Sequence, residues 1–82
     1  MGKTHELKIL PQFFDYVMSG KKRFELRKAD RDYKLGDYLY LREWNGEYTG
    51  RYCFRKITYI YEGTGEYGLA VGYWILGIEQ KF

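Results

Sequence analysis

Apolar and polar residues alternate with a period of two over five stretches of this chain. That alternation is typical of strands with one buried face. The stretches are "HELKIL" from His5, "RFELR" from Arg23, "YLYLREW" from Tyr38, "RYCFRKITYIY" from Arg51 and "YWILGIEQKF" from Tyr73. In the longest of them the alternation falters near Lys56, which indicates a β-bulge. The pattern therefore predicts five strands.

A single helix is predicted between the first two strands. Pro11 is suited to its first turn, where a helix makes no use of the missing N–H. Four apolar residues then recur at three- and four-residue spacing and give the helix one apolar face: Phe13, Phe14, Val17 and Met18. Gly20 is expected to end the helix as a C-terminal cap.

The second predicted strand, "RFELR", carries apolar and charged residues on opposite faces. Phe24 and Leu26 point one way, and Arg23, Glu25 and Arg27 point the other way. We expect Phe24 and Leu26 to face the core, so that the three charged side chains share the outer face.

Two glycine-containing stretches separate the later strands. "NGEYTG" predicts a turn, either a tight hairpin at Asn45-Gly46 or a longer loop that uses Gly50. The stretch from Glu62 to Gly72, "EGTGEYGLAVG", has no clear periodicity and lacks the spacing of a phosphate-binding loop. The stretch is predicted to be a simple connection. The alternative is a lid over the cleft, which would bring Glu66 and Tyr67 into contact with a ligand.

These elements form a single domain over residues 1–82, without repeat or linker. The predicted class is α+β and mainly β. Five or six strands joined late in the chain by hairpins close best into a small barrel or pseudobarrel, because closure hides the sheet edges. The helix would then cap one open end.

Composition removes several classes of function. The chain has one cysteine, Cys53, and one histidine, His5, so it offers neither a disulfide nor a recognisable zinc or iron site. We expect Cys53 to be a small core or interface residue and His5 to be a strand residue with a satisfied ring. No apolar run approaches a membrane span, and no signal region opens the chain. The predicted location is cytoplasmic, with no metal and no cofactor.

The positive charge is concentrated in one segment. The formal net charge is +3, yet Ser19 to Arg31 alone carries +4 and the remainder carries −1. Such a segment favours an anion or a nucleic acid as partner, and a solvated charged edge is the alternative. Aromatic residues are also frequent, at 21% with ten tyrosines, which suits half-buried sheet faces and binding surfaces.

The ordered segments resemble a known family. "HELKILPQFF", "SGKKRFELRKADRDYKLGD", "LREWN", "YTGR" and "GYWILGI" are similar to the ASCH family of the PUA-like superfamily, and more narrowly to an uncharacterised bacterial and phage branch of it. The family's glycine, lysine and E-x-R strand fall on Gly20, Lys22, Glu25 and Arg27. The resemblance spans His5 to Ile78. It implies a five- or six-stranded β-barrel with a helix beside it, and a cleft between the helix end and the E-x-R strand.

The same resemblance implies a link to RNA. Domains of this superfamily are associated with RNA binding, modification and regulation, and some small ASCH proteins are hydrolases. One type acts on acetylated cytidine and resembles this chain at Lys22 and Arg27, but it has a threonine nucleophile where this chain has Glu25. A carboxylate cannot be activated as a hydroxyl nucleophile.

Lys22, Glu25 and Arg27 are the predicted recognition site. Arg27 would grip phosphate or a base edge with its planar fork, and Lys22 would add a mobile positive charge. Glu25 would accept hydrogen bonds from an amine or a ribose hydroxyl, or would orient Arg27. The alternative is a structural ion pair on a sheet face.

Other residues are assigned more simply. Arg31 is predicted to contact phosphate from an otherwise solvated loop, and Tyr67 is predicted to contact the ligand. Trp44 is either a stacking face for a base or an edge aromatic, and Tyr33 is expected to be a core or edge aromatic.

The predicted function is binding of RNA, or of a nucleotide-like ligand, in a cationic cleft. The alternative is a small hydrolase acting on RNA or a modified nucleoside, with Glu25 as general base and Lys22 as electrostatic stabiliser. A third alternative is an accessory module that binds protein. The sequence leaves the oligomeric state open.

Overall fold

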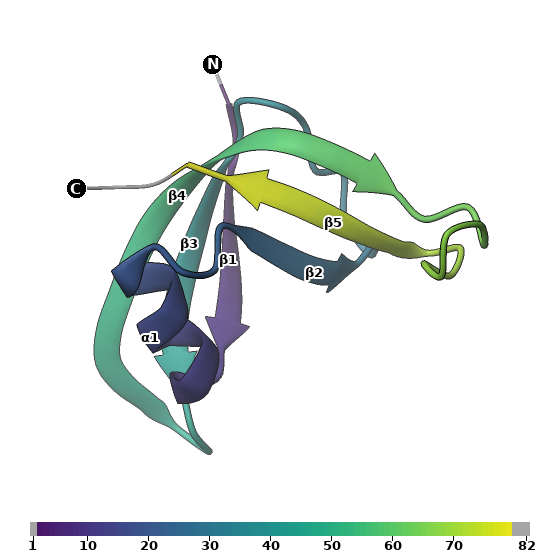
Figure 1. Cartoon of the computed structure of the whole chain (residues 1–82). Helices are drawn as coiled ribbons and strands as arrows, with labels where there is room; N and C mark the ends of the chain where they lie inside the picture. Colours follow the sequence, from purple (N-terminus) through teal and green to yellow (C-terminus); the bar gives the residue numbers. More distant parts are fainter. Residues whose placement is uncertain (1, 80–82) are drawn as a thin grey trace.

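The computed structural model describes residues 2–79, which form one helix and five strands (Figure 1). The elements in chain order are β1 (Thr4–Ile9), α1 (Pro11–Ser19), β2 (Phe24–Lys28), β3 (Tyr38–Trp44), β4 (Tyr48–Glu62) and β5 (Tyr73–Ile78). The protein is therefore mainly β with one helix, and the five predicted strands and the helix between the first two are confirmed.

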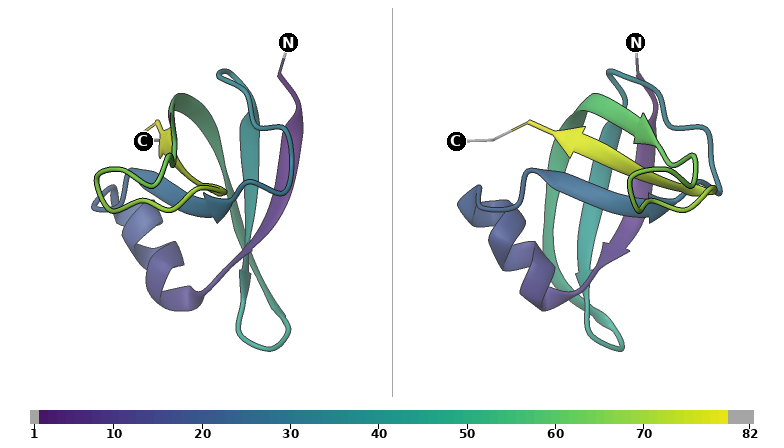
Figure 2. Two further views of the ribbon diagram at one scale, coloured as in Figure 1. Left: turned by 90° about the vertical axis from the view of Figure 1, so that its right-hand side faces the viewer. Right: turned by 45° about the vertical axis from the view of Figure 1, so that its right-hand side comes forward.

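The strands form one sheet in the order β1-β3-β4-β5-β2. β1 pairs with β3 in parallel, and the other neighbours pair antiparallel. The first half of β4 pairs with β3 and its second half with β5, with a register shift between Ile57 and Tyr59 close to the predicted bulge. β4 curves between the two parts, so β5 and β2 cross in front of β1 and β3 (Figures 1 and 2).

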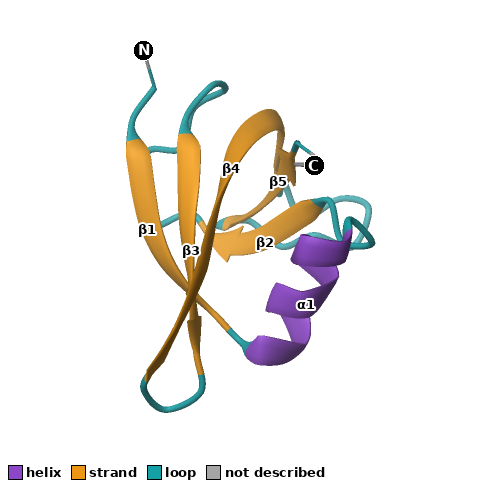
Figure 3. Cartoon of the chain, turned by 90° about the vertical axis from the view of Figure 1, so that its left-hand side faces the viewer, coloured by secondary structure: helices purple, strands orange, loops and turns teal. Residues whose placement is uncertain are grey.

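This sheet is not closed. Within residues 2–79, no strand pairing joins β1 to β2, and these two strands are its edges. The curvature of β4 nevertheless brings α1 and β2 to the same side of β1 and β3, as Figure 3 shows. The inner face of the curved sheet therefore has both the core and the helix packed against it.

The helix begins and ends as its sequence predicts. Leu10 is extended before Pro11, and Gly20 adopts the left-handed conformation at φ 81°. Gly20 donates its N–H to the carbonyl of Val17 at 3.2 Å, which closes the last turn. Phe14 and Val17 are buried, and they anchor the helix to the core.

The core consists of the inward residues of the strands together with this helix face. Leu39, Leu41 and Leu76 have no exposed surface, which confirms the predicted orientation of the third strand. Cys53 and Tyr33 are also buried, as predicted, and burial raises the pKa of the Cys53 thiol. That shift keeps the thiol protonated and unreactive.

His5 has a satisfied ring, as predicted. Its Nε2 lies 2.7 Å from Asp37 Oδ2, and its ring lies 4.8 Å from that of Tyr33. The pKa of Asp37 lies below its ordinary value. Burial acts to raise this pKa, but the hydrogen bonds from His5 and from the backbone N–H groups of Lys3 and Lys34 lower it by more. The buried Asp37 carboxylate thus fixes the start of β3 against β1.

The predicted orientation of β2 is wrong. Phe24 and Leu26 are 44% and 52% exposed, whereas Glu25 is 3% exposed. Glu25 pairs across the sheet with the fully buried Leu76, so its side chain lies on the inner face. The orientation is physically sustainable because cationic side chains neutralise the buried carboxylate. Alternation defined two faces of this short strand but not which face is inside.

Candidate functional site

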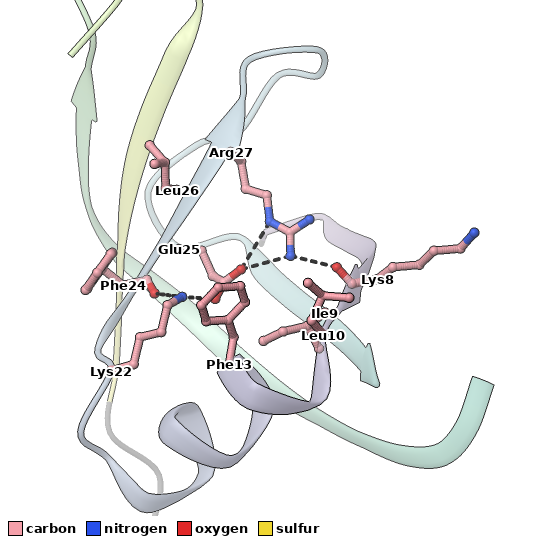
Figure 4. A pocket seen from close by; sticks show the side chains of 9 residues that line it. All are labelled: Lys8, Ile9, Leu10, Phe13, Lys22, Phe24, Glu25, Leu26 and Arg27. Carbon is pink, nitrogen blue, oxygen red and sulfur yellow. Dashed lines mark hydrogen bonds and ion pairs between the residues drawn. The ribbon is translucent and has the colours of Figure 1, made fainter. Parts of the chain in front are cut away.

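A pocket of about 450 Å³ opens between the end of β1, the start of α1 and β2. Figure 4 shows the side chains around it, which come from these three elements and from the segments that join them. A volume of this size lies within the range of small-molecule sites. Its lining combines apolar side chains with a charged cluster: Lys8, Ile9, Leu10, Phe13, Lys22, Phe24, Glu25, Leu26 and Arg27.

The charged part of this lining is the set Lys22, Glu25 and Arg27, called here the Glu25 cluster. Lys22 Nζ donates to Glu25 Oε1 at 2.5 Å, and Arg27 donates from Nε and Nη2 to Glu25 Oε2 at 3.1 and 2.9 Å. The three residues predicted from sequence are therefore brought together. Two cations share one carboxylate, which leaves the cluster with one positive charge in excess.

Arg27 also spans the gap between the two sheet edges. Its Nη2 donates to the backbone carbonyl of Lys8 in β1 at 2.8 Å, a contact drawn in Figure 4. A second arginine crosses the same gap, since Arg31 Nη1 donates to the carbonyl of Glu6 at 3.2 Å. Side chains thus link the edges where strand pairing is absent from the described residues. The position of Arg27 is set by both β2 and β1.

Several cationic donors remain available at the pocket. Lys22 Nζ uses two of its three N–H groups, on Glu25 and on the carbonyl of Phe24 at 2.7 Å. Arg27 uses Nε and Nη2, and its Nη1 has no hydrogen-bond partner within residues 2–79. Glu25 has both oxygens occupied. The arrangement therefore offers donors to an acceptor such as a phosphate or carbonyl oxygen.

The apolar walls of the pocket include two phenylalanine rings. Lys22 Nζ lies 4.8 Å from the ring centre of Phe24 and 5.5 Å from that of Phe13. Neither ring was predicted as a site residue, because Phe24 was assigned to the core and Phe13 to the apolar helix face. Phe13 is in fact 41% exposed. Flat apolar walls beside hydrogen-bond donors suit a planar ligand with a polar edge.

The remaining predicted site residues lie outside this pocket. Arg31 lines an adjoining hollow of about 370 Å³ that shares Lys8 and Arg27 with the pocket. Trp44 lies on β3 with Lys8 Nζ 4.6 Å from its ring centre. Tyr67 is 91% exposed, in the loop that Figure 1 and the right panel of Figure 2 show on the side of the molecule away from α1. The structure does not bring Tyr67 to the pocket.

That loop is held by backbone hydrogen bonds, both within it and to the segment after β2. Gly65 donates to the carbonyl of Leu69 at 2.8 Å, and Ala29 donates to the carbonyl of Gly72 at 2.8 Å. Tyr67 has a positive φ of 56°, which a non-glycine residue adopts at a cost. These contacts tie the loop to the start of the segment after β2 rather than to α1.

A further buried carboxylate was not identified from the sequence. Glu43 in β3 is 3% exposed and accepts hydrogen bonds from Arg51 Nη2 at 2.6 Å and from Thr49 Oγ1 at 2.6 Å. Arg51 Nη2 also donates to Asp15 of α1 at 2.9 Å. This Glu43 cluster (Asp15, Glu43, Thr49 and Arg51) ties the helix to β4. The alternation of Leu39 and Leu41 could have revealed it, because it places Glu43 on the inner face.

The hydrogen bonds in the Glu43 cluster stabilise its charged groups. Those from Arg51 and Thr49 lower the pKa of Glu43, and those to Glu43 and Asp15 raise the pKa of Arg51. The cluster has two carboxylates for one arginine, which is the reverse of the charge balance in the Glu25 cluster.

Over residues 2–79, no group of three His, Cys, Asp or Glu side chains is placed to hold a metal ion. The helix of this part of the chain is also not long and apolar enough to cross a membrane.

Comparison with known proteins shows the family to which the chain belongs. The model of the family "Domain of unknown function (DUF3850)" matches residues 4–78, so the chain belongs to that family. A relative from Escherichia phage P2, described as "Uncharacterized 12.9 kDa protein in GpA 3'region", is 51% identical over 59 residues, which are 71% of this chain. The match covers 54% of that relative's length.

Proposed function

We propose that the protein binds RNA, or a nucleotide-like ligand, in the pocket beside α1. The observation that carries this proposal is the excess positive charge of the Glu25 cluster at the wall of a mostly apolar pocket. Among the described residues, Lys22 and Arg27 retain N–H donors without a partner there, and Phe13 and Phe24 supply flat apolar walls. A nucleotide joins an anionic phosphate to a planar base, so both halves of the ligand find a complementary surface.

In this proposal the fold is a PUA-like pseudobarrel of the ASCH type. Two observations support it. The curved five-stranded sheet brings β1 and β2 within reach of each other, and Arg27 and Arg31 bridge them through the carbonyls of Lys8 and Glu6. Lys22, Glu25 and Arg27 of the G-x-K-x-x-E-x-R motif also gather at one site, as the resemblance implies.

Glu25 acts in this site by orienting Arg27. Both oxygens of its carboxylate already accept hydrogen bonds from cations, and its side chain is 4% exposed. The carboxylate keeps the guanidinium in the plane that also reaches Lys8, with Nη1 left for the ligand. An arginine held in this way loses less entropy when it binds phosphate.

A hydrolase that uses Glu25 as general base is the second candidate. Its support is the family resemblance together with the place of Glu25 at the pocket wall. The described residues that line the pocket include no Ser, Thr, Cys or His, so no hydroxyl, thiol or imidazole group stands beside Glu25. Binding without turnover is therefore favoured.

The binding test compares two arginines of equal charge. Arg27→Ala is expected to weaken binding of uridine monophosphate and of short single-stranded RNA about tenfold, the loss of one charge-assisted contact. Arg23→Ala removes the same charge from an exposed side chain whose Nε donates to the carbonyl of Gly20, and should leave affinity nearly unchanged. Titration calorimetry at low salt measures both, with thermal melts to confirm folding.

Salt dependence and turnover complete the test. RNA affinity should fall with salt, with a logarithmic slope of about −0.7 for each neutralised phosphate. Equal affinities of wild type, Arg27→Ala and Lys22→Ala would remove this pocket as the binding site. Multiple-turnover cleavage of RNA or of an acylated nucleoside, lost in folded Glu25→Gln, would establish the hydrolase instead.

A further inference from the structure

The outer face of β3 and the first half of β4 carries an unusual set of aromatic side chains. Strand alternation points them away from the core residues Leu41 and Cys53. Four of them are between 39% and 56% exposed: Tyr38, Tyr48, Tyr52 and Phe54. With Tyr40 and Trp44, these residues are called here the aromatic face. Exposed aromatic clusters of this kind mark interaction sites.

The rings of the aromatic face are ordered against one another. Tyr40 and Phe54 are cross-strand partners, and their rings are stacked with centres 4.6 Å apart and planes 7° apart. Tyr52 meets both rings edge-on at 5.6 and 6.0 Å. The sheet thus presents rings in fixed orientations, and a further planar group can stack on them with little loss of side-chain entropy.

Basic residues are interleaved with these rings. Arg42 Cζ lies 3.7 Å from the ring centre of Tyr48, and Lys8 Nζ lies 4.6 Å from that of Trp44. Lys56 stands across the sheet from Tyr38. Among the outward positions of residues 4–9, 38–44 and 52–56, the one carboxylate is Glu6, which is already paired with Arg42 at 2.9 Å.

We propose that the aromatic face binds single-stranded nucleic acid, with bases stacked on its rings and phosphates held by Lys8, Arg42 and Lys56. Stacking needs a base whose flat face is free, so an unpaired strand fits this surface and a duplex does not. Nothing in the contacts singles out the ribose hydroxyl, so RNA and DNA strands share the required chemistry.

The charges argue against a second copy of the chain as the occupant. A two-fold interface places the same patch against itself. The cations at Lys8, Arg42 and Lys56 would then face their own copies, with only Glu6 to offset them. A polyanion removes this repulsion. The inference adds a second surface to the proposed function and does not depend on the pocket.

The two surfaces lie next to each other. Lys8 lines the pocket, and together with Tyr48 it also lines the hollow beside Arg31. A strand with a nucleotide in the pocket would thus meet basic side chains as it crosses β1 toward the aromatic face.

The test uses the double variant Tyr52→Ala, Phe54→Ala and a matched control. The probes are oligouridine RNA and oligothymidine DNA of about 12 nucleotides, labelled for fluorescence anisotropy. Wild type should bind both probes at low salt, and the double variant should lose about tenfold or more in affinity. Tyr59→Ala removes a ring that is 61% exposed on the other half of β4 and should change little. Tyr52→Phe keeps the ring and should keep affinity.

Each opposite outcome overturns the inference. Absence of oligonucleotide binding by wild type, unchanged affinity in the double variant, or equal losses in Tyr59→Ala would each do so. A dimer of wild type that the double variant loses, without oligonucleotide binding, would assign the face to self-association. Arg27→Ala, measured with uridine monophosphate in parallel, reports on the pocket alone, so either surface can fail without the other.

Discussion

Glu25 and Glu43 are each 3% exposed, and each points to the inner side of the sheet, yet their surroundings differ in charge balance. Around Glu25 two cations meet one carboxylate. Around Glu43 one arginine meets two carboxylates, because Arg51 also contacts Asp15. The first cluster keeps an excess positive charge beside a pocket, and the second is a link between α1 and β4.

The comparison shows that burial of a charged group does not by itself mark a functional site. Both carboxylates must be paired, since an unpaired buried charge is costly. What distinguishes them is their charge balance and their position relative to the pocket. Within residues 2–79, free donors remain on Lys22 and Arg27 at the pocket wall, whereas Glu43 is absent from that wall.

The largest expected effect is on the free energy of unfolding. It tests whether Glu25 of β2 and Glu43 of β3 both point to the inner face of the sheet. Leu41→Ala should destabilise the fold by about 2–5 kcal/mol, because Leu41 has no exposed surface. Phe24→Ala should cost clearly less, because that side chain is 44% exposed. Denaturant unfolding of the two variants measures the difference. If Phe24→Ala proved as costly as Leu41→Ala, Glu25 would not lie inside and the comparison would fail.

The sequence predicted the elements well because local patterns determine them. Pro11 and Gly20 set the ends of the helix through their backbone preferences, and Leu39 and Leu41 set the inner face of β3. The residues Lys22, Glu25 and Arg27 were also predicted as one site, from their spacing and from a family resemblance.

What the sequence could not supply depends on contacts between distant segments. The face of β2 was predicted wrongly because a five-residue strand with two apolar and three charged positions allows either orientation. The orientation with Glu25 inside is stabilised by Lys22 and Arg27. Arg27 also donates to the backbone carbonyl of Lys8, 19 residues away. A contact to a backbone carbonyl cannot be predicted from residue types. The aromatic face likewise emerges only when β4 is paired with β3.

A smaller effect should separate the two carboxylates by function. Glu25→Gln removes acceptors from Lys22 and Arg27, so Arg27 is no longer held and nucleotide affinity should fall about tenfold. Glu43→Gln should lower the melting temperature through loss of its bonds to Arg51 and leave nucleotide affinity unchanged. Calorimetric titration and thermal melts of the same samples give both quantities.

Two results would contradict this separation. Tighter nucleotide binding by Glu25→Gln would mean that net charge governs the site and that orientation of Arg27 does not. A loss of affinity in folded Glu43→Gln equal to that in Glu25→Gln would mean that the Glu43 cluster takes part in binding.

The smallest effect concerns acid. The hydrogen bonds from Arg51 and Thr49 lower the pKa of Glu43 below its ordinary value of 4.5. A lowered folded-state pKa means that ionised Glu43 stabilises the fold above the unfolded-state pKa, and that this contribution is lost as the pH falls through the folded-state value. The Glu43→Gln variant lacks this contribution at every pH. The difference in melting temperature between wild type and Glu43→Gln should therefore be full near pH 7 and shrink toward about pH 3. Asp37, whose pKa is also lowered, titrates in both proteins and cancels from the difference. A difference that stays constant, or widens, in acid would show that Glu43 contributes by shape rather than by charge, and the contrast with Glu25 would then have to rest on the pocket alone.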